Sequence, residues 1–180
     1  YMNGFYGECL RLEIFGQSHA ESVGMTLEGV PAGARVDFDA LMRFMQRRAP
    51  GRGEYATARR EADIPEFTSG MRGGVTDGAP ITAVIRNTDV RPHDYDALRT
   101  VPRPGHADYS AWLRYGSIPT GGGEFSGRMT APLCIAGGIC LQLLENEGVS
   151  IRTRIVEIGG ARDEKEMHDK IMQAKAEGDS

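Results

Sequence analysis

The chain has 180 residues and a mass of 19.6 kDa, which is the size of one domain or slightly more. Its 40% apolar and 26% charged residues exclude a disordered chain, and its longest nearly unbroken apolar stretch, 131–144, is shorter than the roughly 20 residues that cross a bilayer. The formal net charge of −4 excludes a protein that binds polyanions by bulk attraction. We therefore expect one folded domain, 1–180, with no membrane or nucleic-acid partner.

The cysteines and the first residues bear on where the protein is located. Cys9, Cys134 and Cys140 are odd in number and widely spaced, which is not typical of a disulfide framework or a zinc site. The sequence begins without a basic region or an apolar signal segment. We expect a cytoplasmic protein that holds no metal ion.

Hydrophobic periodicity predicts an α+β fold with an antiparallel sheet. Alternating apolar residues predict strands at 9–15 and 23–30, joined by the polar loop 16–21. Asp37 is placed to cap a helix that begins at Phe38 and ends at Pro50.

Beyond this helix we expect an ordered loop at 52–80, a buried strand at 81–85 and a short helix at 106–115. A helix covered on nearly every side is expected at 127–147, followed by a strand at 151–158 and a charged helix at 162–176. Close packing of another element is the expected reason for the glycines inside the covered helix.

Arginines are concentrated in one segment. Six arginines and a single acid, Glu54, lie between Arg43 and Arg60. The planar guanidinium matches carboxylate and phosphate groups, so the cluster predicts a bound multivalent anion. In a structural alternative, the acids that follow, Glu61 and Asp63, neutralise the cluster, and a GC-rich genome alone would favour arginine over lysine.

Two histidines stand in loops beside glycine and small residues, His19 in the loop 16–21 and His106 in the segment 104–108. Imidazole gains and loses a proton near neutral pH, so both are candidates for proton transfer. In the simpler alternative, each one satisfies a buried hydrogen bond.

The glycine run 121–123 lies just ahead of the covered helix. Backbone N–H groups at the beginning of a helix attract phosphate, and glycine lets a ligand approach closely. The run lacks a Walker lysine and the GxGxxG spacing, so a mononucleotide or flavin phosphate is the candidate ligand. Alternatively, the glycines only connect Tyr115 to the helix.

Five segments stand in order: FGQSHAESVG, RRAPG followed by TARREAD, SGMRGGVTDGAPI, RPGHADYSAWLRYG and GGGEFSGRMTA. Together they closely resemble the chorismate synthase family. The resemblance implies helices sandwiched between antiparallel sheets and a lyase of the shikimate pathway. Such a lyase forms chorismate from 5-enolpyruvylshikimate 3-phosphate with reduced FMN. Family chains are about twice this long, so we expect 1–180 to be the N-terminal portion, inactive alone, with a C-terminal half beyond it.

The resemblance also implies roles for individual residues. His19 would protonate the departing phosphate, and His106 would donate a proton to reduced flavin. The remaining implied contacts are Ser18, Arg48, Arg52 and Arg128 to the substrate and Glu124, Phe125 and Ser126 to FMN. A homotetramer and NADPH as reductant are further expectations. Gln17 and Ala20 depart from the family's usual GESHG, and Glu54 stands where some relatives carry a basic residue.

Two other functions remain open at this point. The chain could be a truncated, noncatalytic paralogue that keeps the arginine pocket and has lost the flavin chemistry. It could also bind RNA through the arginine cluster, although its aromatic residues are few and are not interleaved with the arginines.

Overall fold

The computed structural model describes residues 4–48, 62–88 and 101–179. The chain divides into two compact units, Tyr1–Gly148 and Val149–Ser180, and each is described by itself. The expectation of a single domain stays a prediction.

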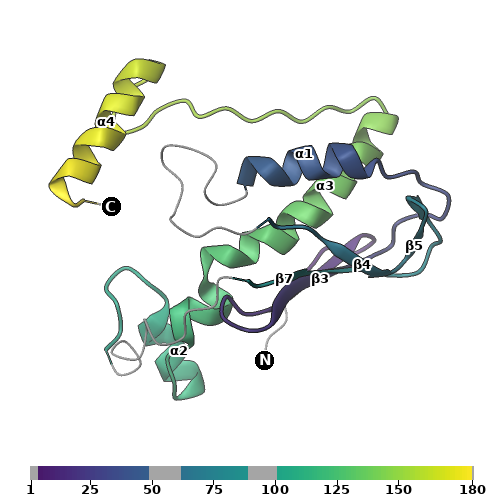
Figure 1. The fold of residues 1–180 in the computed structure, drawn as a ribbon, viewed down its shortest axis with the longest axis horizontal. Helices are drawn as coiled ribbons and strands as arrows, with labels where there is room; N and C mark the ends of the chain where they lie inside the picture. The colour runs from purple at the N-terminus through teal and green to yellow at the C-terminus, as the bar shows by residue number, and fades with distance from the viewer. Residues whose placement is uncertain (1–3, 49–61, 89–100, 180) are drawn as a thin grey trace. The chain divides into compact units, whose positions relative to one another are not determined.

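The first unit is built on a five-stranded antiparallel sheet (Figure 1). In spatial order the strands are β1 (Gly4–Tyr6), β2 (Arg11–Gly16), β3 (Ser22–Glu28), β7 (Ile81–Arg86) and β4 (Glu66–Ser69). The predicted strands at 9–15, 23–30 and 81–85 are thus confirmed. In β3 and β7, the alternate residues that face the core are fully buried: Val23, Met25 and Leu27 of β3, and Ile81, Ala83 and Ile85 of β7.

The expected loop 52–80 is wrong over part of its length. Besides β4, the segment contains a two-stranded ladder of β5 (Met71–Arg72) and β6 (Val75–Thr76). These strands have two to four residues, which is too short to show an alternating pattern in sequence. Residues 52–61 lie outside the described part of the chain.

Helix α3 (Thr130–Asn146) packs on the sheet, and α1 (Phe38–Arg48) packs against α3 (Figure 1). The Asp37 carboxylate accepts hydrogen bonds from the backbone N–H groups of Asp39 and Ala40, at 2.8 and 3.0 Å, so the predicted cap of α1 is confirmed. A side chain at Gly138 of α3 would come within 2.5 Å of a methyl group of Leu41 in α1. Close packing therefore explains this glycine, as expected.

The helical run 120–146 is, among the described residues, the one that is long and apolar enough to cross a membrane by length and composition. Its buried residues have another partner, because Ile135 and Ile139 belong to the same core as Met25 and Leu27 of β3. Packing of α3 on the sheet accounts for this apolar composition.

Shorter elements precede α3. The predicted helix at 106–115 is confirmed as α2 (Asp108–Tyr115). The 3₁₀ helices η2 (Thr120–Phe125) and η3 (Gly127–Met129) follow it. Within η2, Gly121, Gly122 and Gly123 all have positive φ, so this segment turns sharply before α3 begins.

The second unit has one helix, α4 (Glu164–Glu177), among its described residues, and Asp163 caps it. The predicted strand at 151–158 is wrong: its only ladder contact among the described residues is an isolated bridge from Ile158 to Ala161, and residues 151–157 are exposed. Alternation indicates the tendency to form a strand but does not supply a neighbour to pair with. The α+β class with an antiparallel sheet is confirmed.

Candidate anion-binding and proton-transfer site

A buried carboxylate joins two arginines from different elements. Asp63 pairs with Arg48 through one oxygen and with Arg128 through the other. The Asp63 and Arg128 side chains are 1% and 2% exposed, whereas that of Arg48 is 21% exposed. Asp63 therefore neutralises Arg48, as the structural alternative for the arginine cluster expects. Of the three side chains, that of Arg48 is the most exposed to solvent.

Helix α1 and η3 hold these arginines in place. Arg48 ends α1, and its Nε donates to the Thr130 hydroxyl at 2.9 Å. That hydroxyl in turn donates to the carbonyl of Gly127 at 2.6 Å. The side chain of Ser126 caps η3 by accepting from the backbone N–H of Arg128 at 3.2 Å. The junction before α3 thus fixes both arginines relative to one helix.

Asn87, directly after β7, connects the arginines to the loop that carries His19. Its Oδ1 accepts from Nε of Arg128 at 3.0 Å. Its side-chain amide donates to the carbonyls of Gln17 and Ala20, at 3.0 and 2.8 Å. One amide group therefore contacts both the buried arginine and the two residues that flank Ser18 and His19.

The same loop is also attached to the glycine run. The backbone N–H of Ser18 donates to the carbonyl of Gly123, and its hydroxyl donates to the carbonyl of Gly121, both at 3.2 Å. Ser18 is buried, with 1% of its surface exposed, and His19 beside it is partly exposed. The loop presents the imidazole of His19 from a fixed backbone.

His106 belongs to a compact group at the beginning of α2. Its Nδ1 lies 2.7 Å from Oδ1 of Asp108, the first residue of that helix. Arg103 donates to the same carboxylate through Nε at 2.7 Å and through its terminal nitrogen at 2.9 Å. Hydrogen bonding from Arg103 lowers the pKa of Asp108 well below its ordinary value, and burial opposes this shift. An ionised carboxylate only accepts, so Nδ1 carries a hydrogen. Nε2 is the ring nitrogen that does not face the carboxylate, and it lies 3.5 Å from a terminal nitrogen of Arg103.

Gly122 brings His106 and the His19 loop to one segment. A Cβ at this position would lie 2.8 Å from Cε1 and 3.0 Å from Nε2 of His106, so the imidazole packs directly on the glycine backbone. Gly121 and Gly123, on either side, hold Ser18. The run is thus more than a connection, because both histidine loops rest on it.

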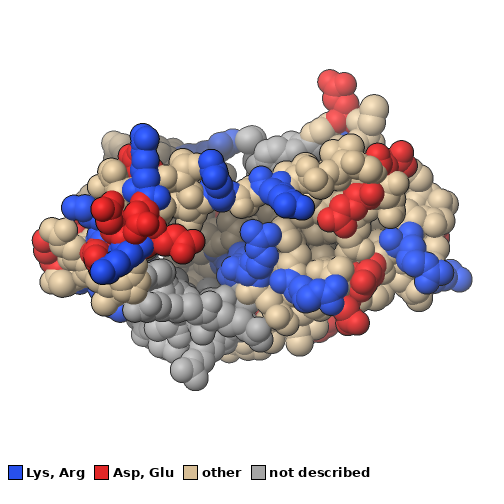
Figure 2. All heavy atoms as spheres, turned by 90° about the horizontal axis from the view of Figure 1, so that it is seen from above, with Lys and Arg blue, Asp and Glu red and all other residues tan. Residues whose placement is uncertain are grey.

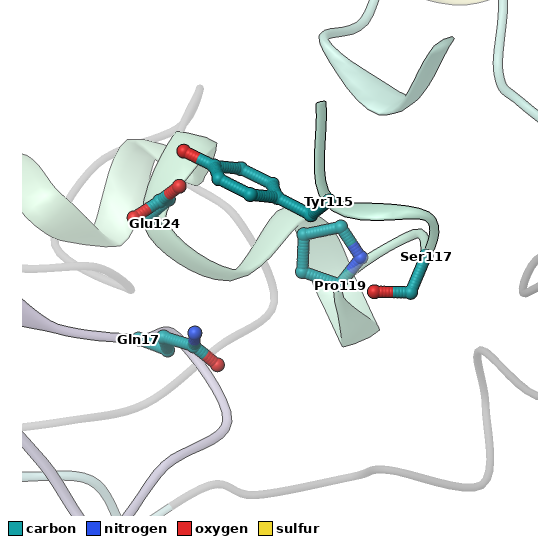
Figure 3. A pocket seen from close by; sticks show the side chains of 5 residues that line it. All are labelled: Gln17, Tyr115, Ser117, Pro119 and Glu124. Carbon is teal, nitrogen blue, oxygen red and sulfur yellow. The ribbon is translucent and has the colours of Figure 1, made fainter. Parts of the chain in front are cut away.

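A cavity of about 300 Å³ adjoins these loops (Figure 3). It is lined by Gln17, Tyr115, Ser117, Pro119 and Glu124. Figure 3 shows the Tyr115 hydroxyl directed at the Glu124 carboxylate. The hydrogen bond between these two side chains raises the pKa of the Tyr115 phenol, and burial of the phenol and the negative charge of Glu124 raise it further.

The structure describes all but one of the residues to which the resemblance assigns a role, while Glu54, Arg59 and Arg60 of the arginine cluster also lie outside the described ranges. Of the three expected flavin contacts, Glu124 lines the cavity, Phe125 has a 40% exposed ring 6.5 Å from that of Tyr115, and Ser126 caps η3. Arg52 lies outside the described residues. A series of contacts joins the two arginines to both histidine loops. It runs from Arg48 through Asp63, Arg128 and Asn87 to the loop of His19. The glycine run 121–123 then connects that loop to His106.

Sequence reasoning missed the residues that hold the others in place. Asn87 and Thr130 carry no signal in the sequence that separates them from ordinary polar residues. Arg103 and Asp108 flank His106 closely enough that the pattern Arg-x-x-His-x-Asp could have pointed to them. No group of three or more potential metal ligands is found within the described ranges.

Several known proteins are similar to this chain. The family model described as chorismate synthase matches residues 10–180. The chorismate synthase of Lancefieldella parvula is 48% identical over 165 residues, which are 90% of this chain and 43% of the relative. That of Korarchaeum cryptofilum is 42% identical over 161 residues, which are 88% and 45%. A crystal structure of chorismate synthase superimposes with a TM-score of 0.63 and 28% identity, over 88% of this chain and 41% of that one. The chain spans less than half the length of these relatives.

Proposed function

The chain belongs to the chorismate synthase family, and we propose that it forms the N-terminal part of an active site that converts 5-enolpyruvylshikimate 3-phosphate to chorismate and phosphate. The chain spans 43% of its relative from Lancefieldella parvula, so the activity is proposed for the complete protein and not for residues 1–180 alone. The observation that supports it best is the continuous set of contacts from Arg48 and Arg128 to the loops of His19 and His106.

The proposed reaction is a 1,4-elimination. One C–H bond of the substrate ring and the C–O bond to phosphate break, a conjugated diene forms, and phosphate leaves with the bonding electron pair. The ring loses a proton and an anion, so there is no net oxidation or reduction. Reduced FMN, when bound, supplies electron density to the ring while the phosphate leaves.

Arg48 and Arg128 are proposed to bind the anionic groups of the substrate. The substrate carries two carboxylates and a phosphate, and guanidinium groups recognise both kinds of anion through paired hydrogen bonds. Their positions are fixed before the ligand arrives, through Thr130, Asn87 and Asp63. Cations held in place stabilise a leaving phosphate more than mobile ones do, because no reorganisation is needed during the reaction. Ser18 and, outside the described residues, Arg52 complete the proposed substrate contacts.

The two histidines are proposed to move protons. His19, on the loop held by Asn87, protonates the departing phosphate. Asp108 orients His106 through Nδ1, so that Nε2 is the atom that transfers a proton toward the flavin site.

We propose that the cavity beside Glu124 receives the flat ring of the flavin. Its volume of about 300 Å³ and the aromatic wall of Tyr115 suit a planar, partly apolar group. The five lining residues include no cation, so the phosphate of FMN needs partners beyond these residues. We propose that Glu124, Phe125 and Ser126 lie along the flavin.

Location and oligomeric state are also proposals. A cytoplasmic location and a homotetramer are proposed from family membership alone. Nothing in the described ranges supports a site for NADPH, so the source of electrons for the flavin is not assigned.

A noncatalytic anion-binding paralogue is the second candidate, and the paired arginines support it as well. RNA binding is less favoured, because basic and acidic side chains are interspersed on the face drawn in Figure 2 and exposed arginines pair with acids, as Arg86 does with Glu66 and Glu21.

The test is chorismate formation by the complete protein. The protein is mixed without oxygen with reduced FMN and 5-enolpyruvylshikimate 3-phosphate, and chorismate is followed by its ultraviolet absorbance. We expect multiple turnovers. Flavin fluorescence, titrated with protein in the presence of the substrate, separates the two candidates: binding of substrate without binding of flavin and without product indicates the noncatalytic paralogue and contradicts the proposal.

A further inference from the structure

We propose that Asp63 is a positioning residue that assembles Arg48 and Arg128 into one anion-binding pair, an inference that rests on the proposed function. One carboxylate oxygen accepts from Arg48 at the end of α1, and the other accepts from Arg128 in η3. A single side chain thus connects a residue of the first helix to the junction that begins α3.

Charge and burial explain why the arginines need such a partner. The Asp63 and Arg128 side chains are almost completely buried, at 1% and 2% exposure. Two guanidinium groups near each other repel strongly where water is excluded. The carboxylate between them offsets this repulsion and leaves one net positive charge in the group. Arg48, whose side chain is 21% exposed, is the arginine of the pair that can present this charge to an anionic substrate.

The backbone of Asp63 is unusual in a way that fits this role. Its φ is 49°, and no other non-glycine residue in the described ranges has a positive φ. This conformation disfavours most side chains, and aspartate tolerates it better than most. Strained backbone persists where the surroundings hold it in place, and it is concentrated at functional sites. Here the turn of the chain coincides with the contact to both arginines.

Each arginine is held on a second side by a neutral group. Nε of Arg48 donates to Thr130 at 2.9 Å, and Nε of Arg128 donates to Asn87 at 3.0 Å. Loss of the carboxylate therefore removes a contact from both arginines at once. Because Asn87 also holds the loop of His19, Asp63 acts on the substrate through the arginines and on that loop through Asn87.

The experiment measures substrate affinity in the complete protein without flavin. Isothermal titration calorimetry with 5-enolpyruvylshikimate 3-phosphate is carried out on the unaltered protein, Asp63→Asn and Asp63→Glu. In Asp63→Asn, the amide nitrogen faces an arginine donor, so one guanidinium must leave. We expect a Kd at least about tenfold higher. Glu66→Gln is the matched control, because Glu66 pairs with Arg86 on the surface, and we expect it to change the Kd less than about twofold.

A double-mutant cycle separates positioning from general support of the fold. Arg48→Gln is expected to weaken binding in the unaltered protein and to have a much smaller effect in Asp63→Asn, because the pair is already dispersed. Additive losses overturn the inference, and so does a Kd for Asp63→Asn within about twofold of the unaltered value.

Variants that fail to fold are detected by circular dichroism. If Asp63→Asn is unfolded, Asp63→Glu decides the question, since it keeps the charge and moves the carboxylate by one methylene group. An affinity loss of about tenfold supports the inference. An unchanged affinity, or unfolding of both variants, overturns it. An unaltered protein that binds no substrate contradicts the proposed function instead.

Discussion

Asp63 and Asp108 are the two buried acids of the described residues, and they are held in opposite ways. Asp108 receives its partners from its own neighbourhood, Arg103 and His106, within five residues. Asp63 receives Arg48 and Arg128, which lie 15 and 65 residues away. The histidine site is therefore a local motif, whereas the arginine site exists only once α1, η3 and the sheet have come together.

The largest expected effect is on the long-range site. Arg128→Ala leaves the Asp63 carboxylate buried with one partner fewer, so the free energy of unfolding should fall by about 3–5 kcal/mol. Urea denaturation of the complete protein measures it. Arg11→Ala is the control, because Arg11 and Glu28 form an exposed pair, and it should cost less than about 1 kcal/mol. Similar losses for the two variants would remove the distinction between buried and surface pairs.

Asp108→Asn tests the local site and should lower stability by about 2 kcal/mol at neutral pH. The pKa of Asp108 is lowered in the folded state, so its contribution is complete above the ordinary aspartate pKa of about 3.9 and is lost as the pH falls below it. The difference in unfolding free energy between the two proteins should therefore shrink between about pH 5 and pH 2. A difference that stays constant over this range contradicts the ionised, hydrogen-bonded state of Asp108.

Gly122→Ala examines the contact of His106 with the glycine run. Its new Cβ would meet the imidazole at 2.8 Å, and its φ of 84° disfavours alanine in any case. Gly116→Ala is the matched control, because Gly116 has a φ of 70° and no atom within 4 Å of the new Cβ. We expect Gly122→Ala to cost about 1 kcal/mol more than the control and to shift the NMR signals of His106. Equal stability losses and unmoved signals would show that the imidazole does not lie on Gly122.

The smallest effect is expected at Asn87. Asn87→Asp keeps an acceptor for Arg128 and loses the two bonds that its amide donates to Gln17 and Ala20. Stability should fall by only about 1 kcal/mol, while amide hydrogen exchange at Ser18 and Ala20 should accelerate. Unchanged exchange at these two residues would mean that Asn87 does not hold the loop.

The difference between local and long-range contacts also decides what the sequence could predict. Strands β2 and β3 and helix α1 carry their own periodicity, β7 and α3 are mostly apolar along their length, and the Asp37 cap lies next to the helix that it begins. Strands β4 to β6 are too short to show a pattern. The segment 151–157 has the pattern, but no strand in the described ranges pairs with it.

The same limit applies to the site. His19 and His106 could be singled out because imidazoles in glycine-containing loops indicate proton transfer, and Arg48 and Arg128 because they match motifs of the family that the sequence resembles. The partnership of Asp63 with Arg128, and that of Asn87 with the loop of His19, join segments far apart in the chain. No local pattern reports such contacts, so only the folded structure reveals them.

His106 is part of one assembled site with His19 and the two arginines, and a single variant tests this most directly. In the complete protein, supplied with reduced FMN without oxygen, His106→Ala should form chorismate at least about a hundredfold more slowly than the unaltered protein. Its free energy of unfolding should change by no more than about 1 kcal/mol, since the imidazole is partly exposed. A near-normal rate of chorismate formation in a folded His106→Ala protein would contradict the account.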